Sequence, residues 1–352
     1  MLNTEFRTGA WTLATVAAML SCAPLARAQT SVADIATFMG PDRQARLLEG
    51  AKKEGVVSLY SSATTEDMNE HIKAFEKKYP GVKVKFWRGD SEGILQRAVT
   101  ETRGGRNEFD LVETSGGTME AGYREKLFQP VKSPMLDDIS PRAKFDGGAW
   151  TGTRFQVHVT AYNTGKTREA DLPKSYADFV DPRFKGKLGI ELDDSEWFAS
   201  LAAASGEEKT IALFKEIVAR NGVSLRKGHT LIANLTASGE VPIALGIYKY
   251  KVEQFKKKGV PIDWIRIPPY VIHPIGIALS QKAQHPHAAL LFFDFLLGEE
   301  GQKIYVAQDT HPTNIKVMPE PEGAVYIDYA KALDAGDKWQ KIFKEIFASR
   351  AR

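Results

Sequence analysis

The sequence predicts an α/β protein with two lobes, mixed sheets, β-strand hinge crossings and a ligand cleft between the lobes. Short apolar strands, each followed by a polar loop and an amphipathic helix, recur along both halves of the chain. Between the two runs, residues 154–162 alternate polar and apolar side chains, which is typical of a strand that crosses from one lobe to the other. The length of 352 residues is what about two domains need.

The composition is that of an ordinary globular protein, with 43% hydrophobic and 26% charged residues. The 47 basic and 44 acidic residues leave a formal net charge of +3. So small a surplus gives no support to a nucleic-acid groove or a polybasic membrane patch. We therefore expect no binding to nucleic acid or to a membrane surface. Separately, we expect a monomer.

Residues 1–28 have the pattern of a secretory signal peptide. Arg7 precedes an apolar run at 10–20, and an A-x-A motif ends at Ala28, where cleavage is expected. The only cysteine, Cys22, lies inside this segment, and the residues before it faintly resemble a lipoprotein box, so lipidation of Cys22 stays open. Cleavage after Ala28 predicts a periplasmic protein without thiols, which excludes disulfides and cysteine catalysis.

The first half of the chain predicts a helix over 41–53 and then three strand–loop–helix units. Their strands are expected at 55–60, 82–87 and 108–113, and their helices around Met68–Phe75, 94–103 and 119–126. Such units form parallel sheets, and open parallel sheets bind ligands at the carboxyl ends of their strands. The polar loops at these ends contain Ser61, Ser62, Arg88, Thr114 and Ser115. Helix N-termini in the same place suit anionic ligand groups.

The second half repeats the pattern less regularly. The expected elements are a short helix at 175–180, strands at 186–192 and 241–247, helices at 207–220 and after His229, a second crossing at 263–269, a return strand at 275–279, and helices at 288–297, 298–308 and 331–350. We therefore expect lobe 1 at 29–157, lobe 2 at 158–270, and a return to lobe 1 with C-terminal helices at 271–352.

Each candidate binding residue of the first lobe also has a simpler structural role. The four hydroxyl residues, Ser61, Ser62, Thr114 and Ser115, can donate to a carboxylate or phosphoryl oxygen, or can cap the helices that follow them. Arg88 can clamp an anion with two hydrogen bonds, or can pair with Asp90 at the surface.

The second lobe offers an acidic, an imidazole and a phenol group. Asp193, with Asp194 and Trp197, either forms an acidic and aromatic wall for an amine or caps a helix. His229 follows a glycine at the expected start of a helix and suits a neutral donor in a cleft. Tyr248 ends a buried strand on the cleft side and is the strongest single candidate. His158 and His273 lie at the two crossings, where lining the hinge competes with ordinary packing.

Seven stretches, read in order, resemble periplasmic solute-binding proteins of ABC importers, in the family 1 and ferric-type group. They are Lys52–Ser62, Phe75–Val82, Phe109–Val112, Ala161–Thr164, Asp181–Lys187, Gly239–Ala244 and His285–Phe295. The resemblance implies two lobes that close on a small-molecule solute by a hinge motion and deliver it to a membrane permease. It implies no cofactor.

The ligand is where the sequence departs from the ferric binders of this group. Those proteins carry two adjacent tyrosines, whereas Lys249 separates Tyr248 from Tyr250 here, and the first loop has no His or Glu ligand. A phenol with a pKa near 10 ligates iron only after losing its proton, so a missing partner is costly. We therefore favour an anionic or polar organic solute, with ferric iron on Tyr248 and Tyr250 as the alternative.

A remote alternative is an exported hydrolase that uses the two adjacent aspartates, 193 and 194, or a serine of the first loop with His229. Adjacent residues of a strand point to opposite faces, so the aspartates do not make a natural acid–base pair. The sequence also contains no G-x-S-x-G, H-E-x-x-H or Walker motif. We therefore expect a binding protein and not an enzyme, and the identity of its solute stays open.

Overall fold

Two sets of parallel strands, joined by two long antiparallel strands, form the sheet of this protein in a computed structural model that describes residues 1–2 and 31–348. In the described residues the main sheet order is β2-β1-β3-β10-β5-β8-β6-β7. Most of the predicted signal peptide, including Cys22 and the cleavage site after Ala28, lies outside the described residues. The mixed sheet and the crossing strands confirm the predicted fold class.

The first set contains the three strand–loop–helix units that the sequence predicts. Its strands are β1 (Val56–Ser61), β2 (Lys83–Arg88) and β3 (Leu111–Ser115), and the helices that follow them are α3 (Thr65–Lys78), α4 (Ser91–Arg103) and α5 (Gly116–Arg124). In α3 the buried residues Met68, His71 and Phe75 share one face, which sets the side that packs inward. The side chain of Thr64 caps this helix by accepting from the Asp67 amide at 3.2 Å.

The second set has the same design with the strand order β8-β6-β7. Its strands are β6 (Leu188–Glu191), β7 (Ser224–Arg226) and β8 (Ile243–Tyr248), and its helices are α6 (Ser195–Ser205), α7 (Glu207–Asn221), α8 (His229–Ser238) and α9 (Lys249–Lys257). The sequence analysis did not predict β7. Three half-buried residues at a sheet edge carry too little periodicity to mark a strand.

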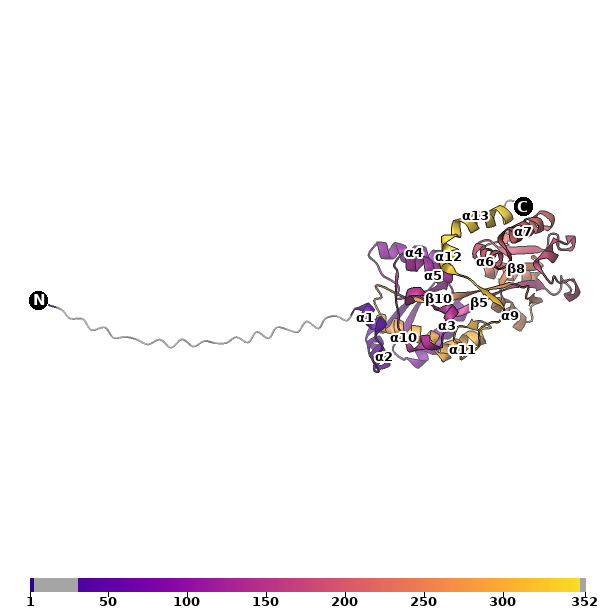
Figure 1. Ribbon diagram of the computed structural model, residues 1–352. Helices are drawn as coiled ribbons and strands as arrows, with labels where there is room; N and C mark the ends of the chain where they lie inside the picture. Colours follow the sequence, from indigo (N-terminus) through magenta and orange to yellow (C-terminus); the bar gives the residue numbers. More distant parts are fainter. Residues whose placement is uncertain (3–30, 349–352) are drawn as a thin grey trace. The chain divides into compact units, whose positions relative to one another are not determined.

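Two long buried strands, β5 (Thr151–Asn163) and β10 (Tyr270–Ser280), connect the two sets (Figure 1). Residues 151–157 of β5 pair with β10, and residues 158–163 pair with β8 and with β9 (Ile262–Ile265). The prediction of a second crossing at 263–269 is therefore corrected for residues 263–265, which belong to β9 and pair with the end of β5. The chain passes to β10 in the residues after β9.

The directions of the strands explain where their polar ends meet. β3 and β5 are both antiparallel to β10, so the first set runs in the direction of β5, whereas β8 is antiparallel to β5. The first set ends at the level of Arg154, through the pairs Ser115–Ile275 and Ile275–Arg154. The second set ends at the level of His158, which pairs with Tyr248. The two carboxyl edges consequently face each other across the middle of β5.

Helices α10, α11 and α12 pack against elements of the first set. Helix α10 is buried over nearly its whole length and packs against α2, which agrees with its almost continuous apolar sequence. The other elements here are α1 (Val32–Thr37), α2 (Arg43–Glu54), β4 (Phe128–Gln129), α10 (Pro286–Leu297), α11 (Glu299–Ala307), β11 (His311–Pro312), β12 (Ala324–Tyr326) and α12 (Tyr329–Asp334). Short 3₁₀ helices occur at Pro134–Asp138, Pro141–Ala143, Asp146–Gly148, Glu169–Asp171, Tyr176–Val180 and Pro182–Phe184.

The last helix, α13 (Gly336–Phe347), packs against α6 and α7 of the second set (Figure 1). The ring of Phe198 in α6 lies 5.8–6.1 Å from the rings of Trp339, Phe343 and Phe347. The last of the C-terminal helices expected within 271–352 therefore packs on the second strand set. An apolar stripe shows that a helix is buried, but not which partner buries it.

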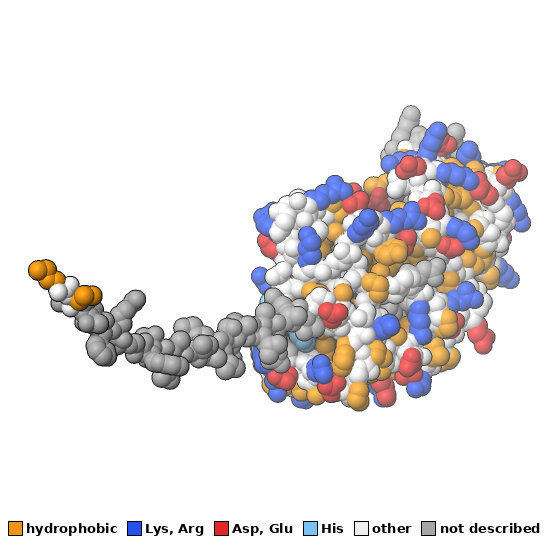
Figure 2. Space-filling model, turned by 60° about the vertical axis from the view of Figure 1, so that its left-hand side comes forward, with side chains coloured by type: hydrophobic (Ala, Val, Ile, Leu, Met, Phe, Trp, Pro, Cys, Tyr) orange, Lys and Arg blue, Asp and Glu red, His pale blue; other side chains and the backbone are white. Residues whose placement is uncertain are grey.

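The visible surface is mixed in charge. On the face in Figure 2, basic and acidic side chains are interspersed over the residues that are coloured by type. Within 31–348 no helix combines the length and the apolar character needed to cross a bilayer.

Candidate ligand-binding cleft

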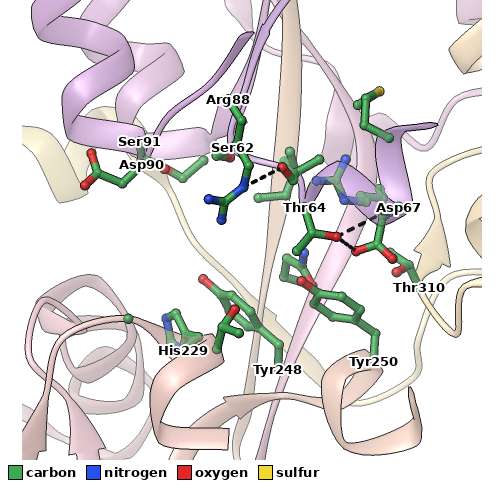
Figure 3. Close-up of a pocket in the computed structure, with 18 of the residues that line it drawn as sticks. Ser62, Thr64, Asp67, Arg88, Asp90, Ser91, His229, Tyr248, Tyr250 and Thr310 are labelled. Carbon is green, nitrogen blue, oxygen red and sulfur yellow. Dashed lines mark hydrogen bonds between the residues drawn. The ribbon is translucent and has the colours of Figure 1, made fainter. Parts of the chain in front are cut away.

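A cavity of about 420 Å³ lies where the two carboxyl edges face each other. Figure 3 shows Ser62, Arg88, Asp90 and Ser91 on one side and His229, Tyr248 and Tyr250 on the other. Cavities of this size hold small molecules. Its lining comes from the carboxyl ends of β1, β2, β3, β7 and β8 and the residues that follow them, from α3 and α9, from β5 and β10, and from the segment around α11.

Arg88 is the charged group that the first lobe offers to the cavity. Its Nε donates to the Ala63 carbonyl at 3.1 Å, and the guanidinium points into the space between the two sides (Figure 3). Asp90 accepts from the Gly93 amide at 2.7 Å and caps α4. In the described part of the chain no carboxylate pairs with Arg88. The proposed surface pair with Asp90 is thus not formed, and the guanidinium is available to an anion.

The four predicted hydroxyl residues divide into two pairs. Ser62 and Ser115 line the cavity, whereas Ser61 and Thr114 are fully buried and do not. The Ser61 hydroxyl donates to Glu113, and the Thr114 hydroxyl donates to Ser91 Oγ at 2.9 Å. The prediction of ligand contact is therefore corrected for Ser61 and Thr114. Side chains alternate along a strand, so one of two adjacent hydroxyl residues faces inward.

A buried ion pair between Arg154 and Glu113 forms the floor of the cavity. Arg154 on β5 lines the cavity and donates to Glu113 on β3. The Thr153 hydroxyl donates to the same carboxylate at 3.1 Å, and the Tyr305 hydroxyl lies 3.5 Å from it. The sequence analysis missed this pair. Its members are 41 positions apart, and no local pattern links them.

The second lobe contributes a layer of aromatic side chains. The rings of His229 and Tyr248 stack with centroids 3.8 Å apart, and the Tyr250 ring follows at 6.1 Å from that of Tyr248. All three line the cavity, with the exposed Lys227 beside them. Burial raises the pKa of Tyr248 and of Tyr250 well above the ordinary value, so both phenols stay protonated and can donate hydrogen bonds.

Two predicted residues of the second lobe do not reach the cavity. Asp193 is exposed on the loop after β6 and does not line it. Trp197 is only 2% exposed and packs in the core, with its ring 6.2 Å from that of Tyr176 and 6.1 Å from that of Phe214. The prediction that Asp193 and Trp197 form an acidic and aromatic wall of the cleft is therefore corrected. Helix α6 begins at Ser195, and Trp197 lies on its buried face.

Three contacts join the first and second sides beside the cavity. Asp67 of α3 accepts from Gln254 Nε2 of α9 at 3.1 Å and lies 3.6 Å from Lys251 Nζ. Lys257 Nζ of α9 lies 2.7 Å from Asp309 Oδ2. These contacts hold α9 against α3 and against the loop after α11.

His71 lines the cavity from α3 and is itself fully buried. Its ring nitrogens lie 3.3 Å from the Asp67 carbonyl oxygen and 3.2 Å from that of Gly301. Burial lowers the pKa of His71 to about 4, although the two carbonyls favour the protonated form. The unfolded chain, with a pKa of about 6.5, binds the proton more readily, so His71 contributes stability above about pH 6.5 that is lost as the pH falls towards 4.

Replacing His71 with glutamine should make folding stability less dependent on pH. One proton taken up on unfolding corresponds to about 1.4 kcal/mol per pH unit in the free energy of unfolding. Urea unfolding of the wild type and of His71→Gln at pH 7, 5.5 and 4.5 measures the difference. We expect a shallower fall for the variant below pH 6.5 and parallel curves above it. Equal slopes below pH 6.5 would contradict the buried, neutral state of His71.

Comparisons with known proteins agree with this architecture. The iron uptake protein A1 of Synechocystis sp. is 26% identical over 288 residues, which cover 77% of this chain and 78% of that protein. Iron-bound HitA from Pseudomonas aeruginosa has a TM-score of 0.71 at 23% identity, over 83% of this chain and 99% of that one. AfuA from Actinobacillus pleuropneumoniae, with fructose-6-phosphate bound, also has a TM-score of 0.71, at 22% identity over 84% and 99% of the two chains.

The family model described as bacterial extracellular solute-binding protein matches residues 61–303. This segment begins at the last residue of β1 and ends within α11, so it includes β2, β3, the second strand set and the cavity-lining residues from Ser62 to Ile275. The resemblance noted in the sequence is thus confirmed, and the chain belongs to the bacterial extracellular solute-binding proteins, the substrate-binding components of ABC importers.

Proposed function

We propose that the cleft binds a small organic anion, such as a phosphorylated or carboxylated solute, between Arg88 and Ser115 of the first lobe and His229 and Tyr248 of the second. The observation that carries this proposal is the Arg88 guanidinium, which points into the cavity without a carboxylate partner in the described part of the chain. Arginine donors suit carboxylate and phosphate oxygens because two parallel N–H groups match two oxygens.

The other charged groups of the lining support an anion as well. Arg154 is neutralised by Glu113, Asp67 is engaged by Lys251 and Gln254, and Asp90 caps α4. Arg88 and the exposed Lys227 then remain as the charges that have no carboxylate partner within 31–348. The cavity therefore has a positive surplus, and protonated phenols and serine hydroxyls add neutral donors around it.

Ferric iron is the second candidate, because Tyr248 and Tyr250 both line the cavity with ring centroids 6.1 Å apart. The named relatives bind different cargo: HitA carries iron, and AfuA carries a sugar phosphate. The fold therefore accommodates both iron and a sugar phosphate, and the side chains that line the cavity determine which ligand binds. Burial that raises the pKa of both phenols opposes the phenolate form that iron needs, so we rank the organic anion first.

The two lobes are proposed to divide near residues 157 and 270 and to close on the solute by bending about β5 and β10. The change of strand partner along β5 between residues 157 and 158 supports the first boundary. We further propose a monomeric, periplasmic protein, cleaved after Ala28, which releases its solute unchanged to the permease.

A thermal-shift screen tests the choice of ligand. Sugar phosphates, carboxylates, inorganic phosphate, polyamines and ferric citrate would each be added to the mature protein. A ligand that binds only the native state raises the melting temperature, by about 2.7 kcal/mol of added stability at 100 times its Kd. We expect organic anions to stabilise the protein, and the best of them to reduce the radius of gyration in small-angle scattering.

The control ligands separate the two candidates. Neutral sugars and polyamines should give no shift. Stabilisation by ferric iron alone, with no stabilisation of Tyr250→Phe by iron, would show that the ligand is ferric iron and not an organic anion. Stabilisation by polyamines alone would contradict the positive surplus of the cavity.

A further inference from the structure

Three side chains that can ligate a metal converge at the wall of the cavity on the second lobe. His158, Asp194 and His229 each offer one ligand atom, and these atoms all lie within 4.8 Å of one another. In the part of the chain that the structure describes, this is the one such group. His158 and Asp194 are buried, and His229 also lines the cavity.

The topology of the second lobe brings these residues together. Asp194 follows β6 and precedes α6, and His229 follows β7 and begins α8. β6 and β7 are adjacent and parallel, so their carboxyl ends share one edge of the sheet. His158 reaches the same edge from β5 through β8, which is paired with both β5 and β6.

The hydrogen bonds around the group leave metal-binding atoms without a partner. His158 Nδ1 lies 3.3 Å from the Val271 carbonyl oxygen, which fixes its proton on Nδ1 and leaves Nε2 with a lone pair. His229 Nε2 lies 3.2 Å from Asp194 Oδ1. The other oxygen of Asp194 and Nδ1 of His229 are buried and have no hydrogen-bond partner. Buried polar atoms are nearly always satisfied, so two orphans in one contact indicate a missing partner.

The acidic surroundings of the group also suit a cation. Glu191 and Glu196 lie close enough to Asp194 to interact with it electrostatically. A cation held by His158, Asp194 and His229 would interact favourably with these neighbouring acidic groups.

We propose that His158, Asp194 and His229 bind a divalent transition-metal ion of the Zn²⁺ or Ni²⁺ class. Two imidazoles and one carboxylate are a ligand set for such ions, with coordination positions left open, and they are a poor set for Mg²⁺ or Ca²⁺. The site uses neither Tyr248 nor Tyr250 as a ligand and goes beyond the proposed function. Because His229 also lines the cavity, an ion here would lie at the cavity wall.

The Val271 carbonyl accepts the hydrogen bond that would orient His158 as a metal ligand. A ligating histidine commonly donates its second N–H to a carbonyl or a carboxylate, which orients the ring. Tyr248 holds the other imidazole by stacking on His229 at 3.8 Å. A group that served only to pack the core would need neither the fixed orientation nor the unpartnered atoms.

Calorimetric titration of tag-free, chelator-treated protein with Ni²⁺ and Zn²⁺ tests the proposal. We expect one ion per chain and no binding of Mg²⁺ under the same conditions. Loss of a group that hydrogen-bonds to a metal ligand typically weakens metal binding by roughly 10- to 100-fold. Asp194→Asn and His229→Gln remove ligands themselves, so each should weaken binding of the ion by more than this. His287→Gln should leave binding unchanged, because His287 pairs with Glu54 at 2.6 Å on the opposite lobe.

Three results would overturn the site. They are failure of the wild type to bind either ion, undiminished binding by both ligand variants, and equal loss in His287→Gln. X-ray absorption of the nickel-loaded wild type provides a readout that does not depend on the folding of any variant: two imidazole ligands support the site, and none overturns it. Tyr250→Phe should still bind nickel. This variant therefore distinguishes the proposed site from ferric-iron binding by Tyr248 and Tyr250.

Discussion

Arg88→Ala is expected to weaken binding of the best organic anion by about 1.5–3 kcal/mol, roughly 10- to 150-fold in Kd, which is the range for a hydrogen bond to a charged group. The guanidinium is held by a single donation from Nε to the Ala63 carbonyl, at 3.1 Å, so its remaining N–H groups are available to the ligand. Isothermal titration calorimetry with the anion selected by the thermal-shift screen measures the change.

Two further variants show whether the effect comes from the shape of the guanidinium. Arg88→Lys keeps the charge but not the paired N–H groups, so we expect an intermediate affinity. Arg168→Ala removes an exposed arginine that pairs with Asp171 at 2.7 Å on the surface, and its affinity should equal that of the wild type. Full affinity in Arg88→Ala would remove Arg88 from the binding site and the anion proposal with it.

The largest loss of stability is expected from Arg154→Met. Glu113 is completely buried, and Arg154 is 6% exposed, so the substitution leaves a carboxylate without its counter-charge in the middle of the sheet. Breaking a buried pair from one side typically costs about 3–5 kcal/mol. Urea unfolding at pH 7, monitored by circular dichroism, should show this as a lower midpoint with an unchanged slope.

The double variant Arg154→Met with Glu113→Gln separates the ion pair from packing. With both charges gone, most of the lost stability should return, because no buried charge remains unpaired. Arg168→Met at the surface should stay within about 0.5 kcal/mol of the wild type. A loss below 1 kcal/mol in Arg154→Met, or a double variant no more stable than the single one, would show that the pair does not hold the cavity floor.

Local patterns were sufficient for most of the secondary structure. The apolar runs at 55–60 and 82–87 correspond to β1 and β2, and the stripe of Met68 and Phe75 corresponds to the buried face of α3. Burial in these elements follows from spacings of two to four residues, which a single sequence displays. Where the spacing was too short to read, as in the three residues of β7, the prediction failed.

The composition of the cleft depended on contacts that no spacing displays. Alternation along β1 turned Ser61 inward, and the start of α6 at Ser195 buried Trp197. That Tyr248, His229 and Arg88 line the cavity could be expected because each lies at or just after the carboxyl end of a strand, the edge where open sheets bind ligands. Whether a given side chain at such an end points into the cavity depends on the register with its neighbours.

The sequence by itself determined the repeating strand–loop–helix units, the loops at the carboxyl ends of the strands and, through its resemblance, the class of binding protein. Only the tertiary structure decided that Arg154 meets Glu113, that α13 covers the second strand set, and that His158, Asp194 and His229 share one wall. The physical reason is the range of the interactions. Periodic burial is decided by residues two to four positions apart, whereas charge pairing and ligand grouping are decided by strand order and register across segments tens of residues apart.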